Sequence, residues 1–275
     1  MNISIHAPAY VLGESSNAEL RLELLNEMTA ASFVEAMKVL PNRKMRILNV
    51  GCGSGHLEAR LSALFSDSLF VGIDNSPQRI AEAMARVKTL KDTNVYEFIE
   101  ADLTTLPLEE EKSFDILIFR FVLCHLSNGL KQFERYLSLV RPGGSVCFEE
   151  CASDGSEYFC NTKNSGYETF IKMIPFQIEA EQSSFEIGFA LLSELKRRSY
   201  SIHYCKIEQP LMQSNRSKSI IRLGFEDAKA FVLQHMKEEE REGIIHSLRE
   251  FEEDKHAYGL YTRSLAVIAK TEGML

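Results

Sequence analysis

Residues 47–57 are Ile47-Leu48-Asn49-Val50-Gly51-Cys52-Gly53-Ser54-Gly55-His56-Leu57. The run 47–50 predicts a short buried strand, and the leucines that follow at 57, 61 and 64 fall on one face of a helix. Between them, every second residue is a glycine, which allows a tight turn and lets a ligand approach the backbone. A strand, a glycine turn and a helix present N–H groups and a helix N-terminus to a ligand. The same pattern also fits an ordinary turn of an α/β protein, so the surrounding sequence has to decide.

A carboxylate ends the next predicted strand. Residues 69–74 are apolar and finish on Asp74, at the interval that places an acid at the tip of the neighbouring parallel strand. There a carboxylate can accept both hydroxyls of a ribose. Asp74 could instead cap the following helix, but Asn75-Ser76-Pro77 offers better capping residues. We therefore expect Asp74 to be free for a ligand.

Strands and helices alternate through the first half of the chain. Further strands are predicted at 95–100, 114–119 and 145–150, with helices at 77–91 and 129–140 and a tight turn at 141–144. This alternation with short connections predicts a mostly parallel sheet with helices on both faces. Ligands bind such sheets at the carboxyl ends of the strands, where the glycine loop, Asp74, Asp102 and Phe119-Arg120 all fall.

The flanks add two strands and the helical cover. The strands are predicted at 201–209 and 261–270, and the helices at 17–40, 167–180, 187–198, 217–236 and 238–252. We therefore expect an α/β fold with a Rossmann-like, seven-stranded, mostly parallel sheet and N-terminal and C-terminal helical cover. Along the chain we expect an N-terminal cap segment and helix (1–44), a ligand-binding core (45–151), and a substrate-side helical insertion with the final strands of the same domain (152–275).

Composition argues against several classes of protein. A net charge of -8 over 275 residues disfavours a nucleic-acid-binding surface. The six cysteines form no Cys-x-x-Cys pair, which predicts reduced, buried thiols and no metal site. The sequence shows no signal-peptide pattern and no apolar run long enough to span a bilayer. We expect a soluble, cytoplasmic protein, a monomer or homodimer, with neither nucleic-acid nor membrane partners.

Together these motifs resemble those of the class I S-adenosylmethionine-dependent methyltransferases. The likeness covers about residues 45–150. Residues 50–55 are similar to the first motif of that family, Asp74 to its ribose-binding acid, and Ala101-Asp102-Leu103 to its adenine-contacting segment. Residues 114–119 with His125-Leu126 resemble the fourth motif, and 139–144 resemble the turn before strand five. The resemblance implies S-adenosylmethionine as cofactor and S-adenosylhomocysteine as product.

The flanks are similar to a bacterial and fungal small-molecule branch of the family, with domains of types 11 and 25. Tyr10-Val11-Leu12-Gly13, residues 120–123 and Ile187-Gly188 carry that likeness, although the branch usually has Glu-Asp where this chain has Glu149-Glu150. In the branch, the N-terminal segment covers the cofactor and the C-terminal helices help to enclose the substrate. The resemblance implies these cofactor-binding residues: Tyr10, Gly51, Cys52, Gly53, Gly55, Asp74, Asn75, Asp102, Leu103, Phe119 and Arg120.

The implied activity is in-line transfer of a methyl group to an oxygen or nitrogen atom of a small molecule. His125 is the best-placed candidate for a general base, while packing or capping at a helix start is the simpler explanation of this histidine. Three alternatives stay open. A nicotinamide dehydrogenase would share the fold, but it prefers a glycine where this chain has His56. A protein that binds S-adenosylmethionine without turnover and a protein methyltransferase would share the motifs.

Overall fold

The computed structural model describes residues 16–108, 113–153, 155, 157–181, 184–227 and 236–272. The chain divides into two compact units. One, here called the sheet unit, comprises residues 30–153, 184–208 and 263–275, and the other, the helical unit, comprises residues 1–29, 154–183 and 209–262. The functional division at residues 44/45 and 151/152 stays a prediction.

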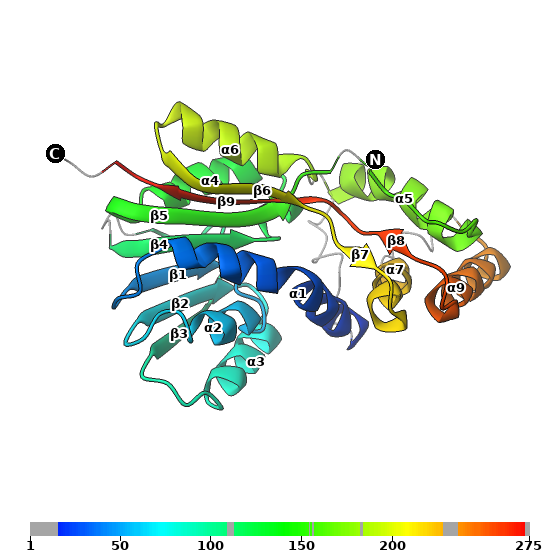
Figure 1. Cartoon of the computed structure of the whole chain (residues 1–275), viewed down its shortest axis with the longest axis horizontal. Helices are drawn as coiled ribbons and strands as arrows, with labels where there is room; N and C mark the ends of the chain where they lie inside the picture. Colours follow the sequence, from blue (N-terminus) through cyan, green and yellow to red (C-terminus); the bar gives the residue numbers. More distant parts are fainter. Residues whose placement is uncertain are drawn as a thin grey trace, which may run out of the picture. The chain divides into compact units, whose positions relative to one another are not determined.

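Seven strands of the described residues form one sheet in the order β3-β2-β1-β4-β5-β9-β6 (Figure 1). The first five strands in this order pair in parallel, and β9 pairs antiparallel with both β5 and β6. The predicted Rossmann-like, mostly parallel sheet is therefore confirmed. The strands are β1 (Arg46–Val50), β2 (Leu69–Asp74), β3 (Val95–Glu100), β4 (Phe114–Arg120), β5 (Val140–Cys151), β6 (Ser201–Glu208) and β9 (Ser264–Lys270).

Both faces of this sheet are covered. Alternate residues of β4 enter two different cores: Leu117 and Phe119 pack in one, and Ile116 and Ile118 in the other. Helices α4 and α6 contribute to the first core, and α2 with the end of α1 contributes to the second. The helices of this unit are the end of α1 (Ser16–Ala36), η1 (Met37–Val39), α2 (His56–Leu61), α3 (Pro77–Val87), η2 (Leu123–His125), α4 (Gly129–Leu137) and α6 (Ile187–Arg197).

The start of β5 differs from the prediction. The sequence predicts a helix to about residue 140, a turn at 141–144 and a strand from 145. The helix ends at Leu137, and β5 already begins at Val140, which pairs with Phe114. The register then shifts between Phe114 and Ile116, and Gly143 adopts a positive φ of 71°. The glycine turn is thus absorbed as an irregularity within the strand.

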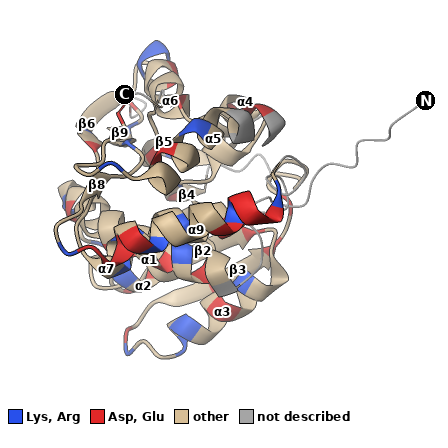
Figure 2. Ribbon diagram, turned by 90° about the vertical axis from the view of Figure 1, so that its right-hand side faces the viewer, with Lys and Arg blue, Asp and Glu red and all other residues tan. Residues whose placement is uncertain are grey.

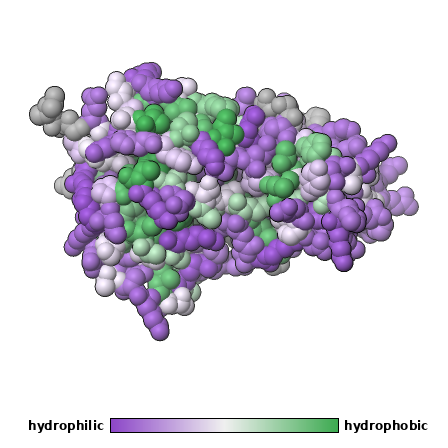
Figure 3. Space-filling view, in the orientation of Figure 1, coloured by the Kyte–Doolittle hydropathy of each residue, from purple (hydrophilic) through white to green (hydrophobic). Residues whose placement is uncertain are grey.

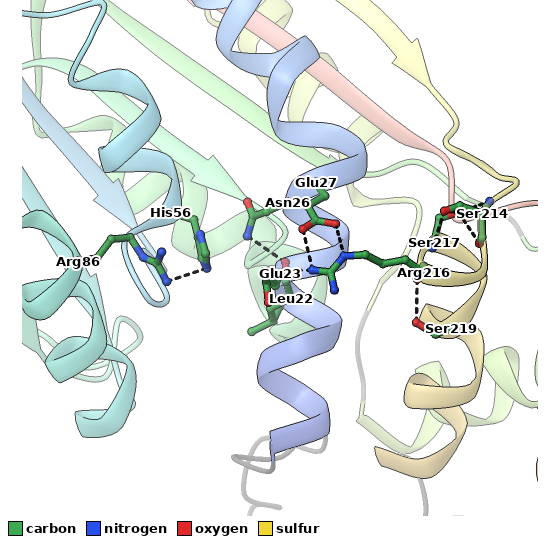
Figure 4. A network of polar contacts seen from close by, with 10 residues as sticks. All are labelled: Leu22, Glu23, Asn26, Glu27, His56, Arg86, Ser214, Arg216, Ser217 and Ser219. Atoms are coloured by element: carbon green, nitrogen blue, oxygen red, sulfur yellow. Dashed lines mark hydrogen bonds and ion pairs between the residues drawn. The ribbon is translucent and has the colours of Figure 1, made fainter. Parts of the chain in front are cut away.

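The helical unit has its own apolar core. Helices α5 (Ser165–Glu181), α7 (Asn215–Asp227) and α9 (Glu238–Glu253) pack around Tyr167, Ile220 and Phe251. Arg216 on α7 forms ion pairs with Glu23 and Glu27 of α1 (Figure 4). The short strands β7 (Leu211–Met212) and β8 (Gly259–Leu260) were not predicted, because two-residue strands carry no periodic pattern.

Charged and polar residues cover most of the surface in view. The acidic residues 238–240 form the exposed first turn of α9, where their negative charges interact favourably with the positive end of the helix dipole (Figure 2). Figure 3 shows a largely hydrophilic face that is interrupted by smaller hydrophobic patches. Among the helices of the described residues, none has both the length and the hydrophobicity of a membrane span.

The six cysteines are free thiols, and Cys52, Cys124, Cys147 and Cys151 are buried as predicted, whereas Cys160 is half-buried and Cys205 is exposed. Over the described ranges, His, Cys, Asp and Glu side chains form no group of three that could hold a metal ion.

Phe133 on α4 offers a test of the core between α4 and the sheet. Its ring is fully buried and contacts the rings of Phe119 and Phe148 at centroid distances of 5.4 and 6.1 Å. We expect Phe133→Ala to lower the free energy of unfolding by about 3–5 kcal/mol in urea denaturation, because it leaves a cavity. Leu130→Ala, on the same helix but 37% exposed, should change it by less than about 1 kcal/mol. Equal losses in the two variants would contradict this packing.

Candidate functional site

The glycine loop between β1 and α2 adopts the conformation that the sequence predicts. Gly51, Gly53 and Gly55 have positive φ angles of 74°, 54° and 73°. The N–H groups of Gly51 and Cys52 both donate to the carbonyl oxygen of Ile73 on β2, at 2.8 and 2.9 Å. Gly55 is the N-cap of α2. The loop is therefore fixed at the carboxyl end of the sheet.

The three glycines are needed for different reasons. A Cβ atom at Gly51 would lie 2.4 Å from Cγ2 of Val122, and one at Gly55 would lie 3.0 Å from Cβ of Ala83. Packing against neighbouring residues therefore excludes side chains at both positions. A Cβ atom at Gly53 would meet no atom of the described residues within 4 Å, so this part of the chain leaves space beside the middle of the loop. That open backbone is where a ligand can approach.

Asp74 holds the loop as well as facing the ligand edge. The residue is 6% exposed, and its Oδ2 accepts a hydrogen bond of 2.9 Å from the N–H of Gly53. Its Oδ1 accepts one of 3.0 Å from the N–H of Ser76, whose own hydroxyl caps α3. As expected, Ser76 rather than Asp74 caps α3, but Asp74 also has two internal partners beside the ligand role that the sequence predicts. Each carboxylate oxygen has a second acceptor direction, which leaves capacity for ribose hydroxyls.

A buried polar group that the sequence analysis missed lies beneath the loop. Asn49 of β1 donates to Oε1 of Glu58 on α2 at 2.8 Å, and both residues are buried. Burial raises the pKa of Glu58 to about 7. Burial, followed by the charges of Glu58 and Asp74, also raises the pKa of the Cys52 thiol, so Cys52 stays neutral. Polar residues in otherwise apolar positions of a strand and a helix were the available signal in the sequence.

Arg86 of α3 contacts Ser54 and His56 at the end of the glycine loop, and Figure 4 shows its contact with His56. Its Nε donates to the carbonyl oxygen of Ser54 at 2.8 Å, and its Nη2 lies 3.0 Å from Nε2 of His56. An arginine can only donate, so Nε2 of His56 is the acceptor. His56 therefore has a structural partner at the position where a nicotinamide dehydrogenase prefers glycine.

The predicted adenine-contacting segment forms a local turn after β3. The exposed Asp102 accepts hydrogen bonds of 2.7 Å at Oδ1 from both the N–H and the hydroxyl of Thr104. The side chain of Leu103 is buried, and its carbonyl oxygen accepts from Arg135 and from the hydroxyl of Tyr136. Both residues are thus held at the same edge of the sheet as the glycine loop, since β3, β2 and β1 pair in parallel.

The side chains at the end of β4 are engaged within the protein. The ring of Phe119 is fully buried against Phe133 and Tyr136. The guanidinium of Arg120 forms an ion pair with Glu149 in which Nε and Oε2 are 2.7 Å apart. A ligand beside these residues would therefore meet their backbone.

The structure describes His125 and Asn75 but not Tyr10, which completes the set of predicted site residues. His125 is the last residue of η2, is half-buried, and its ring meets the ring of Phe185 edge-on at 6.4 Å. This contact agrees with a packing role and does not test a role as base. Asn75 is exposed directly after Asp74. Tyr10 lies outside the described residues, so its predicted place over the cofactor stays a prediction.

Fold and site together define a class of protein. A parallel sheet whose first strand leads into an open glycine loop, with an acid at the end of the second strand, is a dinucleotide- or nucleoside-binding arrangement. The two strands predicted at 201–209 and 261–270 are β6 and β9, and β9 pairs antiparallel with both β5 and the edge strand β6.

Comparison with known families makes this assignment specific. Residues 41–224 match the family model described as "Methyltransferase domain". The chain therefore belongs to this family of methyltransferases, whose cofactor is S-adenosylmethionine, and the predicted class is confirmed.

The relatives differ in what their names say they methylate. The chain is 27% identical to phosphoethanolamine N-methyltransferase 1 of Arabidopsis thaliana over 204 residues, which are 72% of this chain and 39% of that protein. It is 30% identical to a malonyl-[acyl-carrier protein] O-methyltransferase of Bacillus cereus over 165 residues, 60% of this chain and 54% of that protein. The chain thus spans about half or less of the length of these two relatives.

Solved structures support the fold. A phosphoethanolamine N-methyltransferase 2 of Haemonchus contortus, solved with phosphomonomethylethanolamine and S-adenosylhomocysteine, has a TM-score of 0.55 at 16% identity, over 96% of this chain and 60% of that chain. At this identity, the likeness concerns the fold alone.

The different surroundings of Gly51 and Gly53 lead to a prediction. We expect Gly53→Ala to remain folded, with a conformational cost of about 1–2 kcal/mol, and to bind S-adenosylhomocysteine at least about tenfold more weakly in calorimetry, because the new methyl group enters the ligand space. Gly51→Ala should lose about 2–4 kcal/mol of unfolding free energy, because its methyl group overlaps Val122.

Gly243→Ala is the matched control. Its Cβ atom would also meet no described atom within 4 Å, but Gly243 lies inside α9 and has no positive φ. We expect unchanged or slightly higher stability, with affinity like that of the unmodified protein. Normal affinity in Gly53→Ala would show that no ligand passes over this glycine.

Proposed function

We propose that this chain binds S-adenosylmethionine at the carboxyl edge of the sheet unit and transfers the methyl group to an oxygen or nitrogen atom of a small molecule. The open backbone at Gly53, directly hydrogen-bonded to the carboxylate of Asp74, is the observation that carries the proposal. A glycine backbone that a ligand can approach, beside an acid, suits a nucleoside that carries an amino-acid chain. The residues present therefore fit this cofactor.

Several residues would hold the cofactor. The backbone of Gly51–Gly55 would lie along its methionine part, and the spare acceptor directions of Asp74 would take the ribose hydroxyls. Oδ1 of Asp102 is engaged by Thr104, so its Oδ2 and the N–H of Leu103 would face the adenine. The backbone at Phe119 and Arg120 would border the amino-acid end. Cys52, in the loop after β1, and Asn75, in the loop after β2, would also contact the cofactor.

The bound cofactor would supply a methyl group on a positively charged sulfur atom, which is already a strong electrophile. The chain mainly has to align the acceptor and exclude water, and this requires orientation more than a strong base. His125 stays a candidate to take a proton from an oxygen acceptor. Tyr10, if it closes over the cofactor, would add an aromatic face next to the positive charge.

The acceptor class is proposed from the relatives and the charge. One relative is named for an amine-bearing small molecule and the other for a malonyl group on a carrier protein, so a protein-borne acceptor is the alternative. A net charge of -8 suits a cationic amine better than a polyanion such as nucleic acid. The free thiols agree with a reducing, cytoplasmic environment. A monomer or homodimer is proposed as the assembly.

Calorimetric titration tests the cofactor assignment first. We expect S-adenosylmethionine and S-adenosylhomocysteine to bind with dissociation constants on the order of micromolar, corresponding to about -8 kcal/mol. NAD⁺ should not bind, because His56 and its partner Arg86 occupy the position of the dehydrogenase glycine. Binding of NAD⁺ alone would overturn the proposal. Transfer of a labelled methyl group to a panel of small amines and hydroxy acids would then separate an enzyme from a protein that only binds the cofactor.

Replacement of Asp74 tests the ribose contact. We expect Asp74→Ala to weaken S-adenosylhomocysteine binding about 100-fold, or about 3 kcal/mol, because charge-assisted hydrogen bonds to the ribose are lost and the N–H of Gly53 loses its acceptor. Glu82→Ala, which removes a half-buried acid on α3 that accepts a hydrogen bond from Gln78, is the matched control and should bind normally. Equal affinities in the two variants would rule out Asp74 as a ligand contact.

A further inference from the structure

A second buried acid holds the loop that follows β4. Glu150, near the end of β5, is fully buried. Its Oε1 accepts hydrogen bonds of 2.9 Å from the N–H groups of Val122 and Leu123, and its Oε2 accepts one of 3.2 Å from the N–H of Cys124. The thiol of Cys124 is a further hydrogen-bonding neighbour. A carboxylate accepts about four hydrogen bonds, so these donors match its capacity.

The turn that these bonds hold has an unfavourable backbone conformation. Phe121 has a φ of 50°, which a bulky L-residue rarely adopts. Its N–H donates to the carbonyl oxygen of Glu149 at 2.9 Å. Such a conformation persists only where the surroundings enforce it. Three consecutive N–H groups on one buried carboxylate provide that constraint directly after Phe121.

The same turn contacts the glycine loop. Val122 packs against Gly51 so closely that a methyl group on Gly51 would overlap it. The turn continues through η2 to His125. A displacement of residues 121–125 would therefore move the candidate base His125 and change the packing of Val122 against the cofactor loop.

We propose that Glu150 is a positioning residue that keeps the turn 121–125 seated against the cofactor loop. The proposal rests on the proposed function, because it concerns the geometry of the same ligand edge. Glu150 would not touch the cofactor or the acceptor. Its carboxylate would act through the backbone of Val122, Leu123 and Cys124.

Protonation would weaken this arrangement. Burial raises the pKa of Glu150 from its ordinary value of 4.5 to about 7, although the backbone N–H groups lower it. A protonated carboxyl group carries no negative charge and has less acceptor capacity, so its hydrogen bonds with the N–H groups of the turn become weaker. The ionised form, present above about pH 7, is the one that holds the turn.

The stability of the whole protein should respond in the opposite direction. A carboxyl group whose pKa is raised by folding binds more protons in the folded state between pH 4.5 and about 7. Its contribution to stability therefore falls as the pH rises through this interval and is level above it. A residue with only a structural role would make ligand affinity follow stability, whereas a positioning role separates the two.

The titratable groups nearest to Glu150 are two thiols and a second buried carboxyl group, Glu149, whose pKa is also raised by burial. The thiols are those of Cys124 and Cys151, and burial, followed by the contact with Cys151, raises the pKa of Cys124. Glu149 and Arg120 pair with each other on the opposite face of the sheet. On β9, the residue paired with Glu150 is the apolar Leu265. On α6, the close neighbour is Gly188.

The test compares the unmodified protein with Glu150→Gln, which keeps the shape and removes the charge. The amide nitrogen would face an N–H of the turn and could not accept from it. We expect affinity for S-adenosylhomocysteine above pH 7 to fall about tenfold, the effect of one lost charge-assisted hydrogen bond. Amide hydrogen exchange at 122–124 in the ligand-free variant should be faster than in the unmodified protein, with its pH-dependent change near 7 removed.

The matched control is Glu194→Gln on α6. Glu194 is also buried and is bonded to Arg197 and Arg198, away from the turn. It should keep normal affinity and normal exchange at 122–124. Because the pKa of Glu58 is also about 7, the pH effect is taken as the difference between the unmodified protein and Glu150→Gln.

The outcomes are distinct. Normal affinity and exchange in Glu150→Gln, or an affinity loss that only follows a lower melting temperature at every pH, would overturn the positioning role. If Glu150→Gln does not fold, Glu150→Asp replaces it. That variant should retain the pH dependence with weaker binding, and loss of that dependence in a folded Glu150→Asp would overturn the role. Failure of the unmodified protein to bind S-adenosylhomocysteine would instead refute the proposed function.

Discussion

Backbone N–H groups at the carboxyl edge of the parallel sheet need acceptors, and two buried carboxylates supply them. Asp74 accepts from Gly53 and Ser76, and Glu150 accepts from three consecutive residues of the turn after β4. A buried N–H without an acceptor costs free energy that the net gain of one ordinary hydrogen bond does not offset. The conformations of the loops after β1, β2 and β4 therefore depend on acids that come from β2 and β5.

This arrangement explains how a rigid edge can remain open to a ligand. Gly51 and Gly55 are packed against Val122 and Ala83, whereas no described residue covers the Cβ position of Gly53. The loop is thus tightly held at both ends and accessible in the middle. A methyl-transfer enzyme needs such an edge, because its main task is to align two reactants rather than to provide a strong acid or base. The proposed cofactor contacts are accordingly mostly backbone groups and Asp74.

Much of the fold was predictable because apolar runs in buried parallel strands are conspicuous. The bounds of β2 and β3 agree with the prediction, as does the Ser76 cap of α3. The early start of β5 and the short strands β7 and β8 were not predictable from periodicity, because pairing with a partner strand decides them. Of the candidate site residues, Asp74 lies as expected but also has an internal role.

By itself, the sequence determined the order of strands and helices, because that order follows from alternating apolar segments. Its glycine loop and the acid one strand later indicated a nucleoside site, and the resemblance of its motifs to a methyltransferase family implied the class of cofactor. Only the tertiary structure decided which polar groups are buried and what they bind. Glu150 and Val122 are 28 residues apart, and Asn49 and Glu58 lie on different elements. A carboxylate can hold a loop only when folding removes water and brings N–H groups to it. Local sequence patterns do not predict such contacts, because the partners come from different elements.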